Sequence, residues 1–236
     1  MSADARSGYL VASAAAPYRA VGRFAWHFAR GKLRGDPAFA GVLERGLIPA
    51  GNRLLDLGCG QGLLASWLLA ARSHYDGGDW PAGWPAPPRI ARIDGIELMP
   101  RDVARAQAAL GDAACFIAGD IRDREFGKAD AVVILDVLHY LTIPEQDAVL
   151  ERVREALRPA GTLLLRIGDA NGGWGFRWST WVDHASMFAR GHGYVRLYCR
   201  RLAEWTDALA RLGFRVQPVP MSAGTPYANV LLVAHL

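Results

Sequence analysis

Short apolar runs alternate with helical patterns along the middle of this chain, and the alternation restricts the possible folds more than any other feature of the sequence. A strand, a helix and another strand form a crossover, and crossovers of this kind join parallel strands. Ala131–Leu135 is apolar throughout, as expected of a strand that is covered on both faces. The sequence therefore predicts an α/β fold with a doubly wound, mostly parallel sheet between two layers of helices.

The same patterns predict the position of each element. The expected strands are Arg53–Leu57, Ile93–Leu98, Ala114–Ala118, Ala131–Leu135, Thr162–Ile167, Phe214–Pro218 and Asn229–His235. The expected helices are residues 17–47 with a break at Gly31, Gln61–Arg72, Arg101–Leu110, residues 142–157, and one marked by Leu202, Trp205, Leu209 and Leu212. Thr142 and Glu145 have the spacing of a capping box. Residues 73–90, rich in Gly, Pro and Trp, predict a loop.

A glycine-rich turn follows the first predicted strand, in the string LLDLGCGQG, which contains Asp56, Gly58, Cys59, Gly60 and Gly62. Glycines let a ligand approach the backbone, and the helix that follows offers free N–H groups. The dinucleotide pattern needs a third glycine where this chain has Leu63, and no Gly-Lys-Ser/Thr is present. An acid in the turn would repel a pyrophosphate, but it suits a ligand with both a carboxylate and an ammonium group, such as the methionine end of S-adenosylmethionine.

Acidic residues also follow the second and third predicted strands. Glu97 ends the second strand, where a carboxylate can accept two hydrogen bonds from a ribose diol. Asp94 competes for this role but lies inside the strand. Asp120 follows the third strand, where it could accept from an adenine amino group while Leu98 and Ile121 cover the ring faces. Each acid alone could be a helix cap or a surface charge. Acids at consecutive strand ends beside a glycine turn favour a nucleoside ligand.

These motifs resemble the class I S-adenosylmethionine-dependent methyltransferases. The stretches that carry the resemblance lie within about residues 50–168 and are Asp56–Gly62, Gly95–Pro100, Ala118–Arg122, Asp130–Tyr140 and LRPAGTLLL. The resemblance implies a Rossmann-like seven-stranded sheet whose last strand is antiparallel. It also implies S-adenosyl-L-methionine as cofactor and S-adenosyl-L-homocysteine as product. We expect no metal at the site. The N-terminal string GRFAWHFARGKLRGDPAF more weakly resembles bacterial relatives from aryl-polyene or polyketide-like clusters.

The family implies a role for each matching residue. Asp56 and the turn glycines would hold the methionine moiety, Glu97 the ribose hydroxyls, and Asp120 with Ile121 the adenine. Asp136, after the fourth strand, would line the methionine pocket through its backbone or its side chain.

Methylation of an oxygen also needs a base, because the oxygen must lose a proton. His139, in DVLHYL after the fourth strand, is the first candidate, and its alternative role is to shape the pocket. His184, in WVDHASMF, is the second, and its alternative is a surface histidine.

Aromatic residues crowd the segment from Trp174 to Tyr198. They predict either a cover over an aryl or acyl-type acceptor or a small satellite core. The arginines Arg166, Arg177, Arg190 and Arg196 lie among or near them, and one of these could hold a substrate carboxylate. We therefore expect one domain that consists of an N-terminal helical cap (1–48), a cofactor-binding core (49–168), an aromatic substrate-cap insertion (169–200), and a C-terminal helix and strand pair (201–236).

Positive charge gathers at both ends of the chain. Residues 1–50 carry seven basic and three acidic side chains, residues 166–236 eight and four, and residues 51–165 twelve and sixteen. This distribution is too mild to indicate nucleic acid by itself. No Asn/Asp-Pro-Pro-Tyr motif follows the fourth strand, and neither of the two lysines, Lys32 and Lys128, is placed for ribose methylation. These features favour a small-molecule acceptor, free or bound to a carrier, with O-methylation ahead of N- or C-methylation.

Two other functions stay open on the sequence. The basic ends could dock an RNA or protein acceptor, or the chain could be a non-catalytic regulatory protein that only binds the cofactor. The start of the chain has no long apolar stretch of the signal-peptide type, which predicts a cytoplasmic protein. No apolar run is long enough to cross a bilayer. The spacing of the three cysteines fits neither a zinc site nor a disulfide framework.

Overall fold

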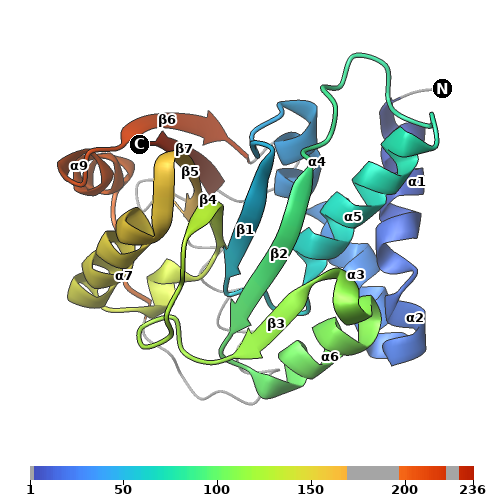
Figure 1. Ribbon diagram of the computed structural model, residues 1–236, viewed down its shortest axis with the longest axis horizontal. Coiled ribbons are helices and arrows are strands. Elements are labelled where there is room, and N and C mark those ends of the chain that lie inside the picture. The colour runs from blue at the N-terminus through green and yellow to red at the C-terminus, as the bar shows by residue number, and fades with distance from the viewer. Residues whose placement is uncertain (1–2, 169–196, 222–228) are drawn as a thin grey trace.

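A seven-stranded sheet forms the centre of the molecule (Figure 1). The structure is a computed structural model that describes residues 3–168, 197–221 and 229–236. The strands are β1 (Gly51–Leu57), β2 (Ile90–Glu97), β3 (Cys115–Ala118), β4 (Ala129–Leu135), β5 (Leu157–Gly168), β6 (Arg215–Pro220) and β7 (Asn229–His235). Their order is β3-β2-β1-β4-β5-β7-β6. The first five strands are parallel, and β7 runs antiparallel to both of its neighbours. The predicted fold class, including the antiparallel last strand, is confirmed.

Helices cover both faces of the sheet (Figure 1). One face packs against the N-terminal helices, α5 and α6, and the other against α7 and α9. The helices are α1 (Ala3–Ala15), α2 (Tyr18–Val21), α3 (Arg23–Gly35), α4 (Pro37–Glu44), α5 (Leu63–Asp76), α6 (Pro100–Leu110), α7 (Ile143–Ala156) and α9 (Leu202–Arg211), with short 3₁₀ helices η1 (Gly111–Ala113) and η2 (Leu138–Tyr140). A hydrophobic core lies on each face of the sheet, and side chains that alternate along β1 contribute to both. Leu54 belongs to the core under the N-terminal helices, whereas Leu55 and Leu57 belong to the core under α7 and α9.

The N-terminal helices do not break where the sequence predicted. The helix continues through Gly31, whose position is exposed and unobstructed. The chain turns instead at Gly22, which has a φ of 138° that only glycine adopts readily. It turns again at Asp36, whose carboxylate caps α4 by accepting from the Ala38 N–H at 3.0 Å. A glycine inside a helix weakens it by about 1 kcal/mol, and tertiary packing overcomes that cost here.

The expected loop at 73–90 is shorter than predicted, because α5 continues to Asp76. Its two tryptophans hold the remaining loop together. Trp80 donates from Nε1 to the Pro85 carbonyl at 3.0 Å and meets Trp84 edge to face at a centroid distance of 5.7 Å. Both rings pack against the core under the N-terminal helices. The structure therefore gives these tryptophans a packing role.

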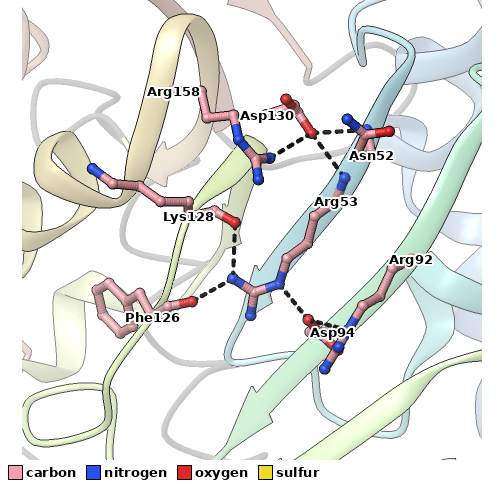
Figure 2. A network of polar contacts seen from close by, with 8 residues as sticks. All are labelled: Asn52, Arg53, Arg92, Asp94, Phe126, Lys128, Asp130 and Arg158. Carbon is pink, nitrogen blue, oxygen red and sulfur yellow. Dashed lines mark hydrogen bonds and ion pairs between the residues drawn. The ribbon is translucent and has the colours of Figure 1, made fainter.

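A polar network holds the beginnings of β1, β2 and β4 together (Figure 2). The Arg53 guanidinium pairs with the buried Asp94 carboxylate and donates to the backbone carbonyls of Phe126 and Lys128. Asp130 accepts from the backbone N–H of Arg53 at 2.8 Å and from Arg158 at 3.1 Å. Asp94 is thus a structural ion-pair partner inside β2, which leaves Glu97 as the acid at the end of that strand.

No helix in the described ranges is long and apolar enough to cross a bilayer. Within the same ranges, no group of three or more His, Cys, Asp or Glu side chains is arranged to hold a metal ion.

Candidate functional site

The glycine-rich turn after β1 has three glycines in left-handed conformations, with φ values of 75° at Gly58, 55° at Gly60 and 74° at Gly62. A Cβ on Gly58 would lie 2.2 Å from Val137 Cγ2, and one on Gly62 would lie 2.7 Å from Phe116 Cζ. A Cβ on Gly60 would meet no atom within 4 Å. Gly58 and Gly62 are therefore required by packing, whereas Gly60 faces open space that a ligand can enter.

Glu97 braces this turn from the end of β2. One of its carboxylate oxygens accepts from the Gly60 N–H at 2.9 Å and the other from the Met99 N–H at 2.9 Å. The two bonds fix the carboxylate directly beside the open glycine. A carboxylate has about four acceptor positions, so Glu97 retains capacity for a diol.

Asp120 lies next to Glu97, because the Gly119 N–H donates to the Glu97 carbonyl at 2.9 Å. Its carboxylate accepts from the Arg122 N–H at 2.9 Å and from the Arg122 guanidinium, which also reaches Glu145 at 2.7 Å. Hydrogen bonds from Arg122 hold the pKa of Asp120 below its usual range, so Asp120 is ionised. Sequence reasoning missed Arg122 and Glu145, although the AGDIRD string placed the arginine two residues from the acid.

The two expected adenine neighbours differ in exposure. Leu98 is 56% exposed and Ile121 is 6% exposed. Leu98 is one of the few large apolar side chains left open among the described residues. An apolar ligand surface placed against it would remove it from water.

Asp56 and Cys59 lie deeper than the other candidates. Asp56 is buried near the end of β1, and burial together with the nearby Glu97 raises its pKa to about 7. Burial and the same acidic neighbours also raise the pKa of the Cys59 thiol. Cys59 is therefore an inert packing group, and its Sγ fills the space where a Cβ on Gly95 would stand.

Asp136 follows β4 with a left-handed φ of 59°. The Arg166 guanidinium donates to the Asp136 carboxylate, with Nε 2.8 Å from Oδ1, and also forms an ion pair with Asp36. Lys32 lies 3.8 Å from the same carboxylate. Arg166 is thus already bound by two carboxylates of its own chain, so it is not placed to hold a substrate carboxylate as the sequence had suggested.

His139 lies in η2, on the turn that follows Asp136. Its backbone carbonyl accepts from the Tyr198 N–H at 2.8 Å, and its ring centroid lies 4.2 Å from that of Tyr140. The buried Gln146 side chain donates to the carbonyls of Leu138 and Leu141 at 3.0 and 2.9 Å, which fixes the turn. Burial lowers the pKa of His139, so the imidazole is neutral at pH 7 and can accept a proton.

His184 and most of the aromatic segment, including Arg177, Arg190 and Arg196, lie outside the described residues. The other candidates lie at or just after the carboxyl ends of the adjacent parallel strands β3, β2, β1 and β4, all at the same end of the sheet (Figure 1). The chain crosses from β3 at one edge over β2 and β1 to reach β4, so the strand order reverses beside β1. In open α/β sheets, ligands bind at such a reversal, outside the carboxyl ends of the strands.

Known proteins of similar sequence include enzymes of two kinds. A carboxy-S-adenosyl-L-methionine synthase from Chromohalobacter salexigens is 30% identical over 130 residues, which cover 53% of this chain and 43% of the relative. A ubiquinone biosynthesis O-methyltransferase from Xanthomonas oryzae pv. oryzae is 28% identical over 116 residues, covering 49% and 43%. The chain thus spans less than half the length of these curated relatives.

The fold has solved counterparts. The magnesium protoporphyrin IX methyltransferase of Synechocystis, with bound SAH, superposes with a TM-score of 0.57 at 20% identity, covering 90% of this chain and 87% of that one. Such a distant match supports the fold alone. A family profile described as a methyltransferase domain matches residues 25–219, which is most of the chain. The protein therefore belongs to the methyltransferase domain family.

Proposed function

We propose that this protein transfers a methyl group from S-adenosyl-L-methionine to a small-molecule acceptor, free or bound to a carrier, with an oxygen as the methylated atom. One observation carries the proposal: an unobstructed glycine, Gly60, lies beside a fixed carboxylate, Glu97, where the strand order reverses. A nucleoside with an amino-acid tail matches this arrangement, since it needs backbone contact at one point and a diol acceptor next to it.

The chain's own residues fit S-adenosyl-L-methionine along its length. Asp56 and the turn around Gly60 would hold the methionine end, Glu97 the ribose hydroxyls, and Asp120 the adenine amino group. Leu98 and Ile121 would cover the adenine ring. When bound, the cofactor supplies an activated methyl group on a sulfonium. The protein's task is then to orient the two reactants and exclude water, which in favourable systems supplies roughly 7–11 kcal/mol of the barrier.

His139 is the proposed base for an acceptor hydroxyl. It is neutral at pH 7, and it follows β4, the strand next to the glycine turn. A neutral imidazole can remove the hydroxyl proton as the oxygen attacks. The ubiquinone-pathway relative is named as an O-methyltransferase, which supports oxygen as the target.

A second candidate follows from the relative named carboxy-S-adenosyl-L-methionine synthase. An enzyme of that kind modifies the cofactor itself: a carboxylate from a second, carboxylate-bearing reactant replaces a proton of the cofactor. The product's mass distinguishes the two candidates. S-adenosyl-L-homocysteine accumulates with methyl transfer, whereas a heavier, carboxylated cofactor accumulates with the second activity.

The first test is to incubate the protein with methyl-labelled S-adenosyl-L-methionine and a host extract, then to count label in separated fractions. Label in small molecules other than the cofactor and its carboxylated form, or on an acyl carrier, supports the proposal. Label in RNA or bulk protein assigns a macromolecular acceptor instead. Cofactor binding without label in any fraction favours the non-catalytic regulatory function.

A matched pair of variants tests the cofactor site separately. Glu97→Gln should weaken binding of S-adenosyl-L-homocysteine at least about tenfold, since it loses charge-assisted hydrogen bonds at the diol. Asp94→Asn, an equally small change three residues away, should lower the free energy of unfolding by about 1–3 kcal/mol and leave the affinity unaltered. Calorimetry and urea unfolding measure the two quantities. Equal affinities in the two variants would contradict the assignment of Glu97.

A further inference from the structure

Arg166 joins three segments that are far apart in the sequence. Its side chain on β5 is 1% exposed, and it donates to Asp136 after β4 and to Asp36 at the start of α4. Lys32 on α3 lies 2.9 Å from Asp36 and 3.8 Å from Asp136. Two cations and two anions therefore form a neutral group, which we call the Arg166 cluster (Lys32, Asp36, Asp136 and Arg166). It ties the N-terminal helices to the end of the sheet where the candidate site lies.

The cluster stays ionised. Burial opposes ionisation of Asp36 and Asp136, but the charges of Arg166 and Lys32 outweigh it and hold the pKa of both carboxyls below the usual range. Removing one partner would leave an uncompensated buried charge, which is far more costly than losing an exposed pair.

Asp136 holds an unfavourable backbone conformation within this cluster. Among the described residues it is one of two non-glycine positions with a positive φ, the other being Ala160. A left-handed backbone costs a non-glycine residue roughly 1–2 kcal/mol, so surrounding contacts must maintain it. The forked guanidinium of Arg166, which bonds both oxygens of the Asp136 carboxylate, provides that constraint.

The constrained backbone sets the position of the next residue, Val137, which touches the cofactor turn. Val137 Cγ2 occupies the space directly over Gly58, where a Cβ would be only 2.2 Å away. The N–H groups of Gly58 and Cys59 in turn bond to the Ile96 carbonyl on β2. Contacts therefore run without a gap from Arg166 through Asp136 and Val137 to the turn that contains Gly60.

We propose that Arg166, together with Asp36, is a positioning residue that holds the turn at 136–140 against the glycine turn and so shapes the cofactor pocket. This inference rests on the proposed function. It assigns the Asp136 carboxylate to Arg166, so Asp136 contributes to the pocket through its main chain. It also makes the junction of α3 and α4 part of the site, since Asp36 shares the same guanidinium.

The chain contains a closely matched control. Arg158 and Asp130 come from the same two strands, β5 and β4, and pair at 3.1 Å at the opposite ends of those strands. This pair is more exposed, with side chains 41% and 24% accessible, and it belongs to the structural network of Figure 2. Removing Arg158 removes the same type of ion pair without touching the turn after β4.

The experiment measures affinity for S-adenosyl-L-homocysteine by calorimetry, so it needs no acceptor. Arg166→Met should weaken binding at least about tenfold, because small displacements in a preorganised site cost one to two orders of magnitude. Arg158→Met should change it less than about twofold. Wild-type affinity in Arg166→Met would overturn the proposal. Absence of binding by the wild-type protein would instead refute the proposed function on which it rests.

A second pair of variants distinguishes the contribution of the Asp136 main chain to cofactor binding from that of its carboxylate. Asp136→Gly and Asp136→Ala both remove the carboxylate, but only glycine adopts a φ of 59° without strain. Asp136→Ala should therefore bind several-fold more weakly than Asp136→Gly. Equal losses in both variants would show that the left-handed backbone at position 136 does not set the pocket, and would overturn the main-chain assignment.

Far-UV circular dichroism and thermal melting accompany each measurement. If Arg166→Met does not fold, Arg166→Lys and Arg158→Lys decide the matter, since lysine keeps the charge but lacks the fork that spans two carboxylates. Arg166→Lys should weaken binding several-fold and Arg158→Lys should not. Equal affinities in this pair would overturn the proposal.

Discussion

Gly60 and Gly62 stand two residues apart and share a left-handed backbone, yet the same substitution should affect them differently. Gly62→Ala places a Cβ 2.7 Å from the packed ring of Phe116, so it should cost at least about 1–3 kcal/mol of stability beyond the backbone strain. Gly60→Ala meets only the backbone strain of about 1–2 kcal/mol. Its methyl group enters the open space beside Glu97, so cofactor affinity should fall at least about tenfold.

Urea unfolding and calorimetry with S-adenosyl-L-homocysteine separate the two effects. Gly60→Ala should show the smaller loss of stability and still bind poorly. If Gly60→Ala kept wild-type affinity, the open side of the turn would not face the ligand.

Asp56 should make the protein less stable as the pH rises. Its pKa is raised to about 7 in the folded chain, whereas an unfolded aspartate titrates near 4. The folded state therefore binds the proton more tightly, and its contribution to stability is complete below about pH 4. That contribution declines as the pH rises towards 7 and is constant above it. The loss across the window should be ~2–4 kcal/mol.

Asp56→Asn removes this titration. The difference in unfolding free energy between variant and wild type should therefore shift in favour of the variant from pH 4.5 to pH 7.5. Urea titrations at the two pH values measure it. Parallel pH dependence of the two proteins would show that Asp56 is ionised throughout.

The sequence predicts the position of a candidate residue in the fold where that residue is close to a recognisable strand end. Glu97 and Asp120 were assigned from their positions after apolar runs, and the structure places both at the predicted edge of the sheet. Arg166 and Asp36 could not be paired in advance, because 130 positions separate them and no periodic pattern links them. Their contact depends on how the N-terminal helices pack, which is a tertiary property.

At the scale of single elements, the first turn of α7 offers a direct test. Thr142 and Glu145 form the predicted capping box, with the Thr142 N–H donating to the Glu145 carboxylate at 2.8 Å. Thr142→Ala should lower the free energy of unfolding by about 1 kcal/mol.

Thr206→Ala is the control, because the Thr206 hydroxyl donates to the Ala203 carbonyl within α9 and does not cap a helix. Its replacement should change stability by no more than ~0.5 kcal/mol. Equal losses in urea unfolding would show that the box adds nothing.

Elements were predicted well where local chemistry and tertiary packing agree. The bounds of β7 match the prediction, since its apolar run pairs with β5 on one side and β6 on the other. β5 begins at Leu157 rather than Thr162, despite Pro159 and Gly161. Leu157 pairs with Ala129 before the register shifts, and Ala160 takes a left-handed φ of 61°. Such an irregular strand leaves no simple pattern in the sequence.

At the scale of the whole molecule, the two ends of the sheet carry separate ion-pair networks, one around Arg53 and one around Arg166. Arg53→Met would leave the buried Asp94 with Arg92 as its remaining partner in Figure 2. We expect a loss of about 3 kcal/mol in stability, because a buried carboxylate loses an ionic partner. Affinity for S-adenosyl-L-homocysteine should stay within about twofold of wild type at a temperature where the variant is folded. A large loss of affinity would mean that the two networks are coupled.

The strand order also bears on how the chain is made. β6 precedes β7 in the sequence, but β7 lies between β5 and β6. β6 is therefore synthesised before β7, the strand with which it pairs in the described part of the chain. Until β7 is available, both edges of β6 are unpaired. Pro218 and Pro220 have no N–H groups, so they reduce the hydrogen bonds that the waiting strand can offer to a neighbouring nascent chain. We therefore expect replacement of Pro218 and Pro220 to increase aggregation of the chain before β7 joins the sheet.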